Sequence, residues 1–150
     1  MSSTTHNFSN RVVLITGATG GMGQAISRSM AEASAQLVLT DLDADAGAAL
    51  VDDLGGGDSI MFCCTDVSDA SSVKHLVAQT TERFGRLDCA VNAAAIEFET
   101  VPLADCADED FDRMMQVNTT GLFTCMKHEL RAILKHGDGE AIVNIASSSS

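Results

Sequence analysis

The sequence predicts an α/β fold in which a parallel sheet is covered by helices on both faces. Short apolar runs alternate with segments of helical periodicity from one end of the chain to the other. The apolar runs are continuous, which is typical of strands that are buried on both faces. Right-handed crossovers between such strands produce an open, doubly wound sheet, and the 150 residues suit one domain, 1–150.

Two strand–helix units occupy the first third of the chain. Residues 12–15 are a β-branched apolar run, and apolar side chains then recur at helical spacing from residue 21 to residue 33. Residues 37–40 form a second apolar run. A weaker helical pattern follows over residues 43–54 and ends in the glycine run 55–57. We therefore expect strand, helix, strand and helix in that order.

Three further strands and two helices complete the pattern. Residues 60–64 predict the third strand, and Ser68 is expected to cap the helix that follows it. Residues 87–93 predict the fourth strand. A long helix is expected from Asp108 to Lys135, before a fifth strand over residues 141–146. The fifth strand would leave an apolar sheet edge, so we expect the sheet to continue in a longer protein.

The composition argues against several classes of function. With 21 acidic and nine basic side chains, the formal net charge is −12, which would repel nucleic acid. The five cysteines show no C-x-x-C spacing, so neither a zinc site nor a disulfide framework is expected. Residues 1–10 are polar, unlike a signal peptide, and no apolar run is long enough to span a bilayer. We expect a soluble cytoplasmic protein with no metal and no membrane partner.

The first strand is followed by a glycine-rich loop of sequence T-G-A-T-G-G-M-G over residues 16–23. In a doubly wound sheet, ligands bind beyond the carboxyl ends of the strands. Glycines there let backbone amides approach a pyrophosphate, and the following helix directs its positive end toward it. The loop therefore predicts a nucleotide site, with a purely structural turn as the alternative.

Asp41 ends the second strand, 18 residues after Gly23. A carboxylate at this place can accept hydrogen bonds from the ribose hydroxyls of adenosine and would repel a 2′-phosphate. Leu42 follows it and Gly20 occupies the loop, so no basic side chain adjoins it in the sequence. These features favour NAD over NADP. The alternative is a helix N-cap, a role that either Asp41 or Asp43 could serve.

The chain resembles the short-chain dehydrogenase/reductase family along its whole length. The family's glycine motif T-G-x-x-x-G-x-G is met by Gly17, Gly21 and Gly23, although Gly20 also fits the T-G-x-x-G-x-x-G form of the extended subclass. Later motifs resemble the compact, NAD-using subclass: Asp66-Val67, Asn92-Ala93-Ala94-Ala95 in place of N-N-A-G, residues 117–121 and residues 142–148. The resemblance implies a Rossmann-type fold and NAD binding by Gly17, Thr19, Gly20, Gly21, Met22, Gly23, Asp41, Leu42, Asp66, Val67, Asn92, Ala93 and Ala94.

The resemblance also implies hydride transfer between nicotinamide and a secondary alcohol or ketone, assisted by Asn118 and Ser147. Asn118 lies within an apolar helical stripe, where an unpaired amide would cost roughly 1–3 kcal/mol. It is therefore either a satisfied core residue or the family's catalytic asparagine, which kinks its helix and holds a water in the proton relay. Ser147 aligns with the serine that polarises the carbonyl oxygen, whereas Ser148, Ser149 and Ser150 are expected to form a polar tail.

The family's proton carrier is the tyrosine of a Tyr-x-x-x-Lys pair that lies beyond the position of Ser147. The chain contains no tyrosine. Two hypotheses follow from this observation. The chain is either the cofactor-binding part of an NAD-dependent oxidoreductase that forms a homo-oligomer, a dimer or tetramer, or it is a non-catalytic NAD-binding or interaction module.

Overall fold

A single parallel sheet runs through the middle of the molecule. The computed structural model describes residues 6–98, 101–137 and 140–147. The order of the strands across the sheet is β3-β2-β1-β4-β5, and every neighbouring pair is parallel. The order reverses between β1 and β4, so the doubly wound α/β fold predicted from the sequence is confirmed. The strands are β1 (Val12–Thr16), β2 (Gln36–Asp41), β3 (Ile60–Cys64), β4 (Cys89–Asn92) and β5 (Ala141–Asn144).

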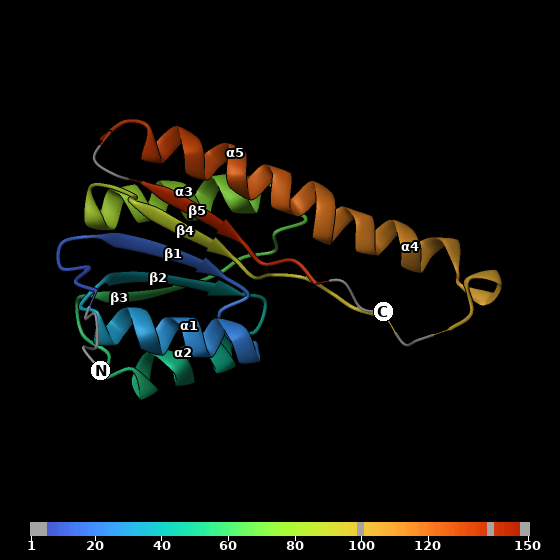
Figure 1. Ribbon diagram of the computed structural model, residues 1–150, viewed down its shortest axis with the longest axis horizontal. Helices are drawn as coiled ribbons and strands as arrows, with labels where there is room; N and C mark the ends of the chain where they lie inside the picture. The colour runs from blue at the N-terminus through green and yellow to red at the C-terminus, as the bar shows by residue number, and fades with distance from the viewer. Residues whose placement is uncertain (1–5, 99–100, 138–139, 148–150) are drawn as a thin grey trace.

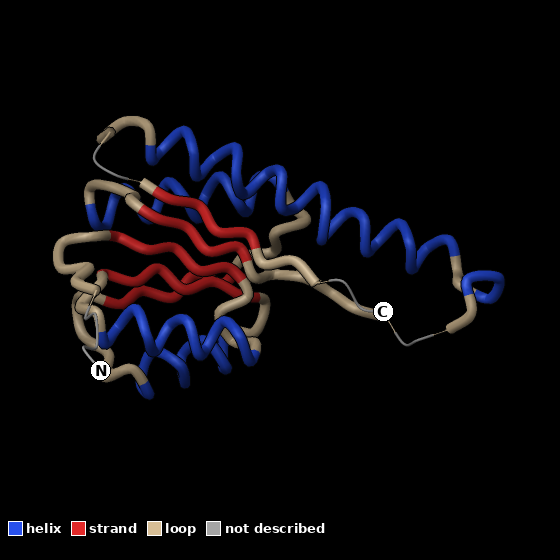
Figure 2. The backbone as a smooth tube through the Cα atoms, in the orientation of Figure 1, coloured by secondary structure: helices blue, strands red, loops and turns tan. Residues whose placement is uncertain are grey.

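Helices cover both faces of this sheet (Figures 1 and 2). One face carries α1 (Gly21–Glu32) and α2 (Ala44–Asp53), and the other carries α3 (Ala70–Phe84) and α5 (Leu122–Ile133). The chain enters α5 from α4 (Asp108–Met115) through a π-helical segment, η2 (Gln116–Gly121). A short 3-10 helix, η1 (Leu103–Asp105), precedes α4. In Figure 1, α4 projects beyond the carboxyl ends of the strands.

The two faces of β1 build two separate parts of the core. Val13 and Ile15 pack with side chains of α1 and α2, whereas Val12 and Leu14 pack with side chains of α3 and α5. This alternation follows from the two-residue period of a strand. All four side chains are at most 1% exposed. Burial on both faces explains why the sequence shows a continuous apolar run at this strand.

Two boundaries near the sheet differ from those predicted. The N-cap of α3 is Asp69, whose side chain accepts a hydrogen bond from Ser71 N at 3.0 Å, so the predicted cap at Ser68 is wrong. The Ser68 hydroxyl instead donates to Asp66 Oδ1 at 2.6 Å. The fourth strand is shorter than predicted because its ladder with β1 runs only over Cys89–Asn92.

The long helix predicted from Asp108 to Lys135 is present, but it is not uniform. Its hydrogen bonding becomes π-helical over η2, and α5 ends at Ile133. Gly121 closes the π segment where the helix passes the junction of β3 and α3. A Cβ atom added there would lie 2.9 Å from the carbonyl oxygen of Val67. This close approach of two backbones explains why the position is a glycine.

The β5 side of the molecule exposes several apolar side chains. Val143 on β5 is 49% exposed, and Phe111 and Met115 on α4 are 51% and 40% exposed. Helical periodicity predicts burial for Phe111 and Met115, but α4 extends past the sheet that would cover them. β5 ends at Asn144, short of the predicted residue 146. Across the described ranges, no helix has the length and apolarity needed to cross a membrane.

Candidate functional site

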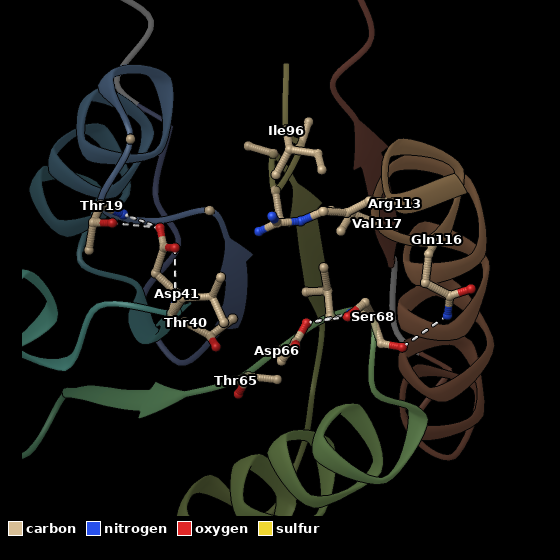
Figure 3. A pocket seen from close by; sticks show the side chains of 17 residues that line it. Thr19, Thr40, Asp41, Thr65, Asp66, Ser68, Ile96, Arg113, Gln116 and Val117 are labelled. Carbon is tan, nitrogen blue, oxygen red and sulfur yellow. Dashed lines mark hydrogen bonds between the residues drawn. The ribbon is translucent and has the colours of Figure 1, made fainter. Parts of the chain in front are cut away.

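A cavity of about 490 Å³ opens at the carboxyl ends of the strands, where the strand order reverses. One wall is the loop between β1 and α1 together with the end of β2, and the facing wall comes from α4 and η2 (Figure 3). The sequence predicted nine of the lining residues as cofactor ligands. These are Gly17, Thr19, Gly20, Asp41, Leu42, Asp66, Val67, Ala93 and Ala94.

The glycines of the loop after β1 serve two different purposes. Gly17 has a φ of +67°, and a Cβ atom there would lie 2.7 Å from Ala93 C and Ala94 N. At Gly23 a Cβ atom would lie 2.0 Å from Gly17 O, so the fold itself requires these two glycines. Gly21, by contrast, has no atom of the described residues within 4 Å of such a Cβ atom, apart from its chain neighbours and the backbone of its own helix. The space beside Gly21 is therefore free for something other than the protein.

The N-terminus of α1 lies at this edge of the sheet and has no side-chain cap. Its N-cap is Gly20, which has no side chain to accept a hydrogen bond from the first amides. The N-termini of α2 and α3, in comparison, are capped by the carboxylates of Asp43 and Asp69. A helix end whose N–H groups lack side-chain partners, with the positive end of the helix dipole behind it, is suited to an anion such as a phosphate.

Asp41 lies at the end of β2, on the same wall as the loop. Its Oδ2 accepts hydrogen bonds from the backbone N–H of Thr19 at 3.0 Å and from the Thr19 hydroxyl at 2.6 Å. Its Oδ1 accepts from Leu42 N at 2.8 Å. Since Asp43 caps α2 by accepting from Ala46 N at 2.9 Å, the N-cap alternative for Asp41 is wrong. Asp41 instead joins the second strand to the glycine loop and faces the cavity.

Asp66 and Ser68 form the part of the cavity that follows β3. The Asp66 Oδ1 atom accepts from both the backbone N–H and the hydroxyl of Ser68. The Ser68 carbonyl in turn accepts from Gln116 Nε2 at 3.1 Å, and this bond ties the third strand's loop to the facing wall (Figure 3). Val67, between them, is 9% exposed and packs with the buried Cys125 of α5.

The facing wall contains residues that the sequence reasoning missed. Arg113, Gln116 and Val117 line the cavity from α4 and η2, and the Arg113 guanidinium points into it (Figure 3). Their spacing of three and four residues places them on one helical face, which is the signal that could have found them. The other lining residues that were not predicted as ligands are Thr40, Thr65, Ser68, Ala95 and Ile96.

A buried polar cluster lies behind the end of β4. Asn92, which is 5% exposed, donates from Nδ2 to Glu129 Oε2 at 2.9 Å and to Asn144 Oδ1 at 3.1 Å. Burial raises the pKa of Glu129 to about 7, although the hydrogen bond from Asn92 acts in the opposite direction. Burial, reinforced by the Glu129 charge, also raises the pKa of Cys125 to about 12, so this thiol stays protonated.

Asn118 lies in the π-helical segment and is bound to a distant part of the backbone. Its Oδ1 accepts from Ile96 N and its Nδ2 donates to Ile96 O, both at 2.9 Å. Both polar atoms of the amide are thus satisfied by the segment that follows β4, 22 residues away in the chain. The irregular helix at this position agrees with the expected kink. The catalytic role of Asn118 stays a prediction.

Several predicted site residues do not line the cavity. Gly21, Met22 and Gly23 form the first turn of α1, where Gly21 and Met22 are exposed. Asn118 binds Ile96 in the segment after β4, and Asn92 binds the Thr16 hydroxyl. Ser147 is exposed in the loop after β5. Ser148, Ser149 and Ser150 lie outside the described residues. Within the described ranges, no group of three or more His, Cys, Asp or Glu side chains is arranged to hold a metal ion.

Comparisons with known proteins agree with this arrangement. The family model described as short chain dehydrogenase matches residues 11–150. A 2,5-dichloro-2,5-cyclohexadiene-1,4-diol dehydrogenase of Sphingobium indicum is 37% identical over 142 residues, which are 95% of this chain and 56% of that protein. Levodione reductase of Leifsonia aquatica is 36% identical over 149 residues, 97% of this chain and 55% of that protein. A 3beta-hydroxysteroid dehydrogenase of Mediterraneibacter gnavus is 34% identical, over 93% and 50% of the two chains.

Solved structures of short-chain dehydrogenases/reductases also resemble this chain. A crystal structure described as a short-chain dehydrogenase/reductase SDR:Glucose/ribitol dehydrogenase from Brucella melitensis superposes with a TM-score of 0.89 at 36% identity. The match covers 95% of this chain and 58% of that one. A short-chain type dehydrogenase/reductase from Mycobacterium marinum gives a TM-score of 0.87 at 30% identity. The chain spans about half the length of the curated relatives it matches.

Proposed function

The chain belongs to the short-chain dehydrogenase/reductase family, and from that premise we propose that it is the cofactor-binding part of an NAD-dependent oxidoreductase. The whole protein would transfer hydride between nicotinamide and a secondary alcohol or ketone. The observation that supports this most strongly is the pairing, at one cavity, of an uncapped helix N-terminus with a carboxylate at the end of β2. Residues 1–150 would form the Rossmann-type NAD-binding domain of the longer protein.

The residues of the cavity fit the parts of NAD. The amides at the start of α1 and the space beside Gly21 suit the pyrophosphate. Asp41 would accept hydrogen bonds from the adenosine ribose, since its three present donors leave part of its acceptor capacity free. Asp66 and Val67 would contact the adenine, and Ala93 and Ala94 would pack beneath the cofactor.

Selection of NAD over NADP is assigned to Asp41. A 2′-phosphate would have to approach this carboxylate, and Asp66 adds a second negative charge to the same cavity. Arg113 is the cation of the lining, but it enters from the facing wall on α4 (Figure 3). The Asp41 carboxylate would thus lie beside the ribose, and the Arg113 guanidinium would lie across the cavity from it. This arrangement favours NAD, which lacks the 2′-phosphate of NADP.

In the catalytic step, bound NAD would accept or supply the hydride. Ser147 would donate a hydrogen bond to the reacting oxygen, and Asn118 would hold the segment around Ile96 in place beside a water of the proton relay. The tyrosine and lysine of the family's Tyr-x-x-x-Lys pair would come from the part of the protein beyond this chain. We propose a cytoplasmic homo-oligomer acting on a small alcohol or ketone, in keeping with the diol, levodione and steroid named for the relatives.

A non-catalytic NAD-binding module is the second candidate, because the 150 residues contain no tyrosine that could act as the proton carrier. The reading frame after Ser150 separates the two. A Tyr-x-x-x-Lys sequence there supports the oxidoreductase, whereas a stop codon directly after Ser150 supports the binding module.

The cofactor assignment is tested at Asp41. We expect Asp41→Ala to weaken NADH binding by the intact protein about tenfold or more, since a hydrogen bond to a charged group contributes roughly 1.5–3 kcal/mol. NADPH binding should weaken less or improve, because the repulsion is removed. Fluorescence titration of both cofactors measures this.

Asp43→Ala is the matched control for that experiment. It removes the N-cap of α2 at a cost of about 1 kcal/mol in stability and does not touch the cavity. Its affinities for NADH and NADPH should equal those of the unchanged protein. Unchanged titration curves for both cofactors in Asp41→Ala would contradict the assignment.

A further inference from the structure

Glu129 is a buried acidic residue that the proposed function leaves unused. It lies on α5 and is 1% exposed. Its Oε2 accepts the hydrogen bond from Asn92, whereas Oε1, which is also buried, finds no hydrogen-bond partner among the described residues. Burying a carboxyl group with half of its acceptor capacity unused costs free energy. A role in the fold or in the site would offset that cost.

A chain of hydrogen bonds leads from Glu129 to the cavity. The Asn92 amide that Glu129 holds accepts at Oδ1 from the Thr16 hydroxyl at 3.4 Å. The same hydroxyl oxygen accepts from Ala94 N at 3.3 Å. Ala94 lines the cavity. Three residues, from α5, β4 and β1, thus connect a buried carboxyl to Ala94 at the cavity floor.

These side-chain bonds add to backbone bonds that already hold the segment after β4, in which Ala93 N donates to Thr16 O at 3.2 Å. A small pocket of about 10 Å³ lies against Thr16, Asn92 and Cys125, so the apolar side chains there do not fully enclose the end of β4. On the side that faces Gly17, the backbone of Ala93 and Ala94 has no room for an additional atom. It lies so close to Gly17 that a Cβ atom there would be 2.7 Å from Ala94 N. A small shift of β4 would therefore move the glycine loop.

We propose that Glu129 is a positioning residue for cofactor binding, which fixes the Asn92 amide and, through Asn92 and Thr16, the backbone of Ala94 at the cavity floor. The inference rests on the proposed NAD site. It requires an acceptor oxygen at position 129 rather than a negative charge. Glutamine meets that requirement, whereas leucine, of similar volume, does not.

The test compares NADH dissociation constants of the intact protein and its variants by fluorescence titration. Glu129→Gln should stay within about twofold of the unchanged protein, and Glu129→Leu should bind at least about fivefold more weakly, the loss expected for one hydrogen bond. Ile133→Val changes a buried residue one turn further along α5, outside the polar chain. It should lower the melting temperature and leave the dissociation constant within about twofold.

Thr16→Val tests whether the effect of Glu129 passes through the Thr16 hydroxyl. It also provides the test if Glu129→Leu does not fold. Valine keeps the shape of threonine and removes the hydroxyl, so NADH binding should weaken about as much as in Glu129→Leu. The double variant should be no weaker than the weaker single variant, because both changes break one chain.

Three results would overturn the inference while leaving the NAD site intact. They are an unchanged dissociation constant in Thr16→Val and Glu129→Leu, equal weakening by glutamine and leucine, and multiplied effects in the double variant. Failure of the unchanged protein to bind NADH would contradict the proposed function as well.

Discussion

Asp88 and Glu129 are both 1% exposed, but they lie at opposite ends of the sheet in opposite electrostatic surroundings. Asp88, just before β4, accepts hydrogen bonds from the side chains of Arg11 and Arg86 and from Val12 N. Burial by itself would raise the pKa of Asp88, but these donors together hold it below its ordinary value. Glu129 has one amide donor, and burial raises its pKa to about 7.

The difference separates a structural end of the sheet from a functional end. At the amino end, Asp88 ties the starts of β1 and β4 together with charged donors that compensate its burial. At the carboxyl end, some polar groups lack hydrogen-bond partners. The first amides of α1 have no side-chain cap, and Glu129 Oε1 has no partner among the described residues. The amides at the start of α1 can bind an anion at the cavity, whereas Glu129 does not line the cavity and is connected to it only through Asn92 and Thr16.

The largest expected effect comes from breaking the amino end. Asp88→Ala should lower the free energy of unfolding by about 2–4 kcal/mol, because it leaves a buried N–H without its acceptor and removes the carboxylate that two partly exposed arginines bind. Urea unfolding of the intact protein measures this loss. The folded fraction should bind NADH with an unchanged dissociation constant, and weaker binding would show that the two ends are not independent.

The pH dependence of stability should separate the two carboxyl groups. The pKa of Glu129 is raised from 4.5 to about 7, so its contribution to stability is full below pH 4.5 and is lost as the pH rises through 7. The unchanged protein should therefore lose roughly 3 kcal/mol relative to Glu129→Gln between pH 4.5 and pH 8. Asp88 acts in the opposite direction, since its lowered pKa gives stability that is lost as the pH falls below about 4. A flat difference between the two proteins across this range would contradict the assignment to Glu129.

Alanine substitutions at Gly23 and Gly21 should have smaller effects on stability, and the two effects should differ. Gly23→Ala should cost about 1–3 kcal/mol in stability, because its Cβ atom would collide with Gly17 O. Gly21→Ala should keep or improve stability by up to about 1 kcal/mol, since nothing lies near its Cβ atom and alanine favours a helix. The same variant should weaken NADH binding at least about tenfold by keeping the pyrophosphate from the helix end. Tight NADH binding by Gly21→Ala would place the cofactor elsewhere.

Local patterns made most of the fold predictable. The run Val12–Ile15 is apolar on both faces because helices cover both faces of β1, and Asp41 marks the end of β2 because a buried strand stops where charge begins. Of the nine predicted lining residues, Asp41 ends β2 and the other eight lie in the loops directly after strands. Their position follows from the parallel topology alone.

The contacts that join distant segments could not be predicted in the same way. The π-helical segment η2 breaks the phase of the long helix, and one extra residue turns a helix by about 100°. Periodicity also predicted burial for Phe111, which is exposed because α4 extends past the sheet, and it did not single out Arg113, which faces the cavity. The bond between Asn92 and Glu129 joins residues 37 positions apart, and no local pattern predicts it.

Hydrogen exchange of the intact protein, with and without saturating NADH, tests whether the carboxyl end of the sheet binds the dinucleotide while the amino end only holds the fold together. We expect NADH to slow exchange at residues 17–23 and 93–96 and to leave residues 86–88 unchanged. Equal protection at both ends, or none at residues 17–23, would contradict the account.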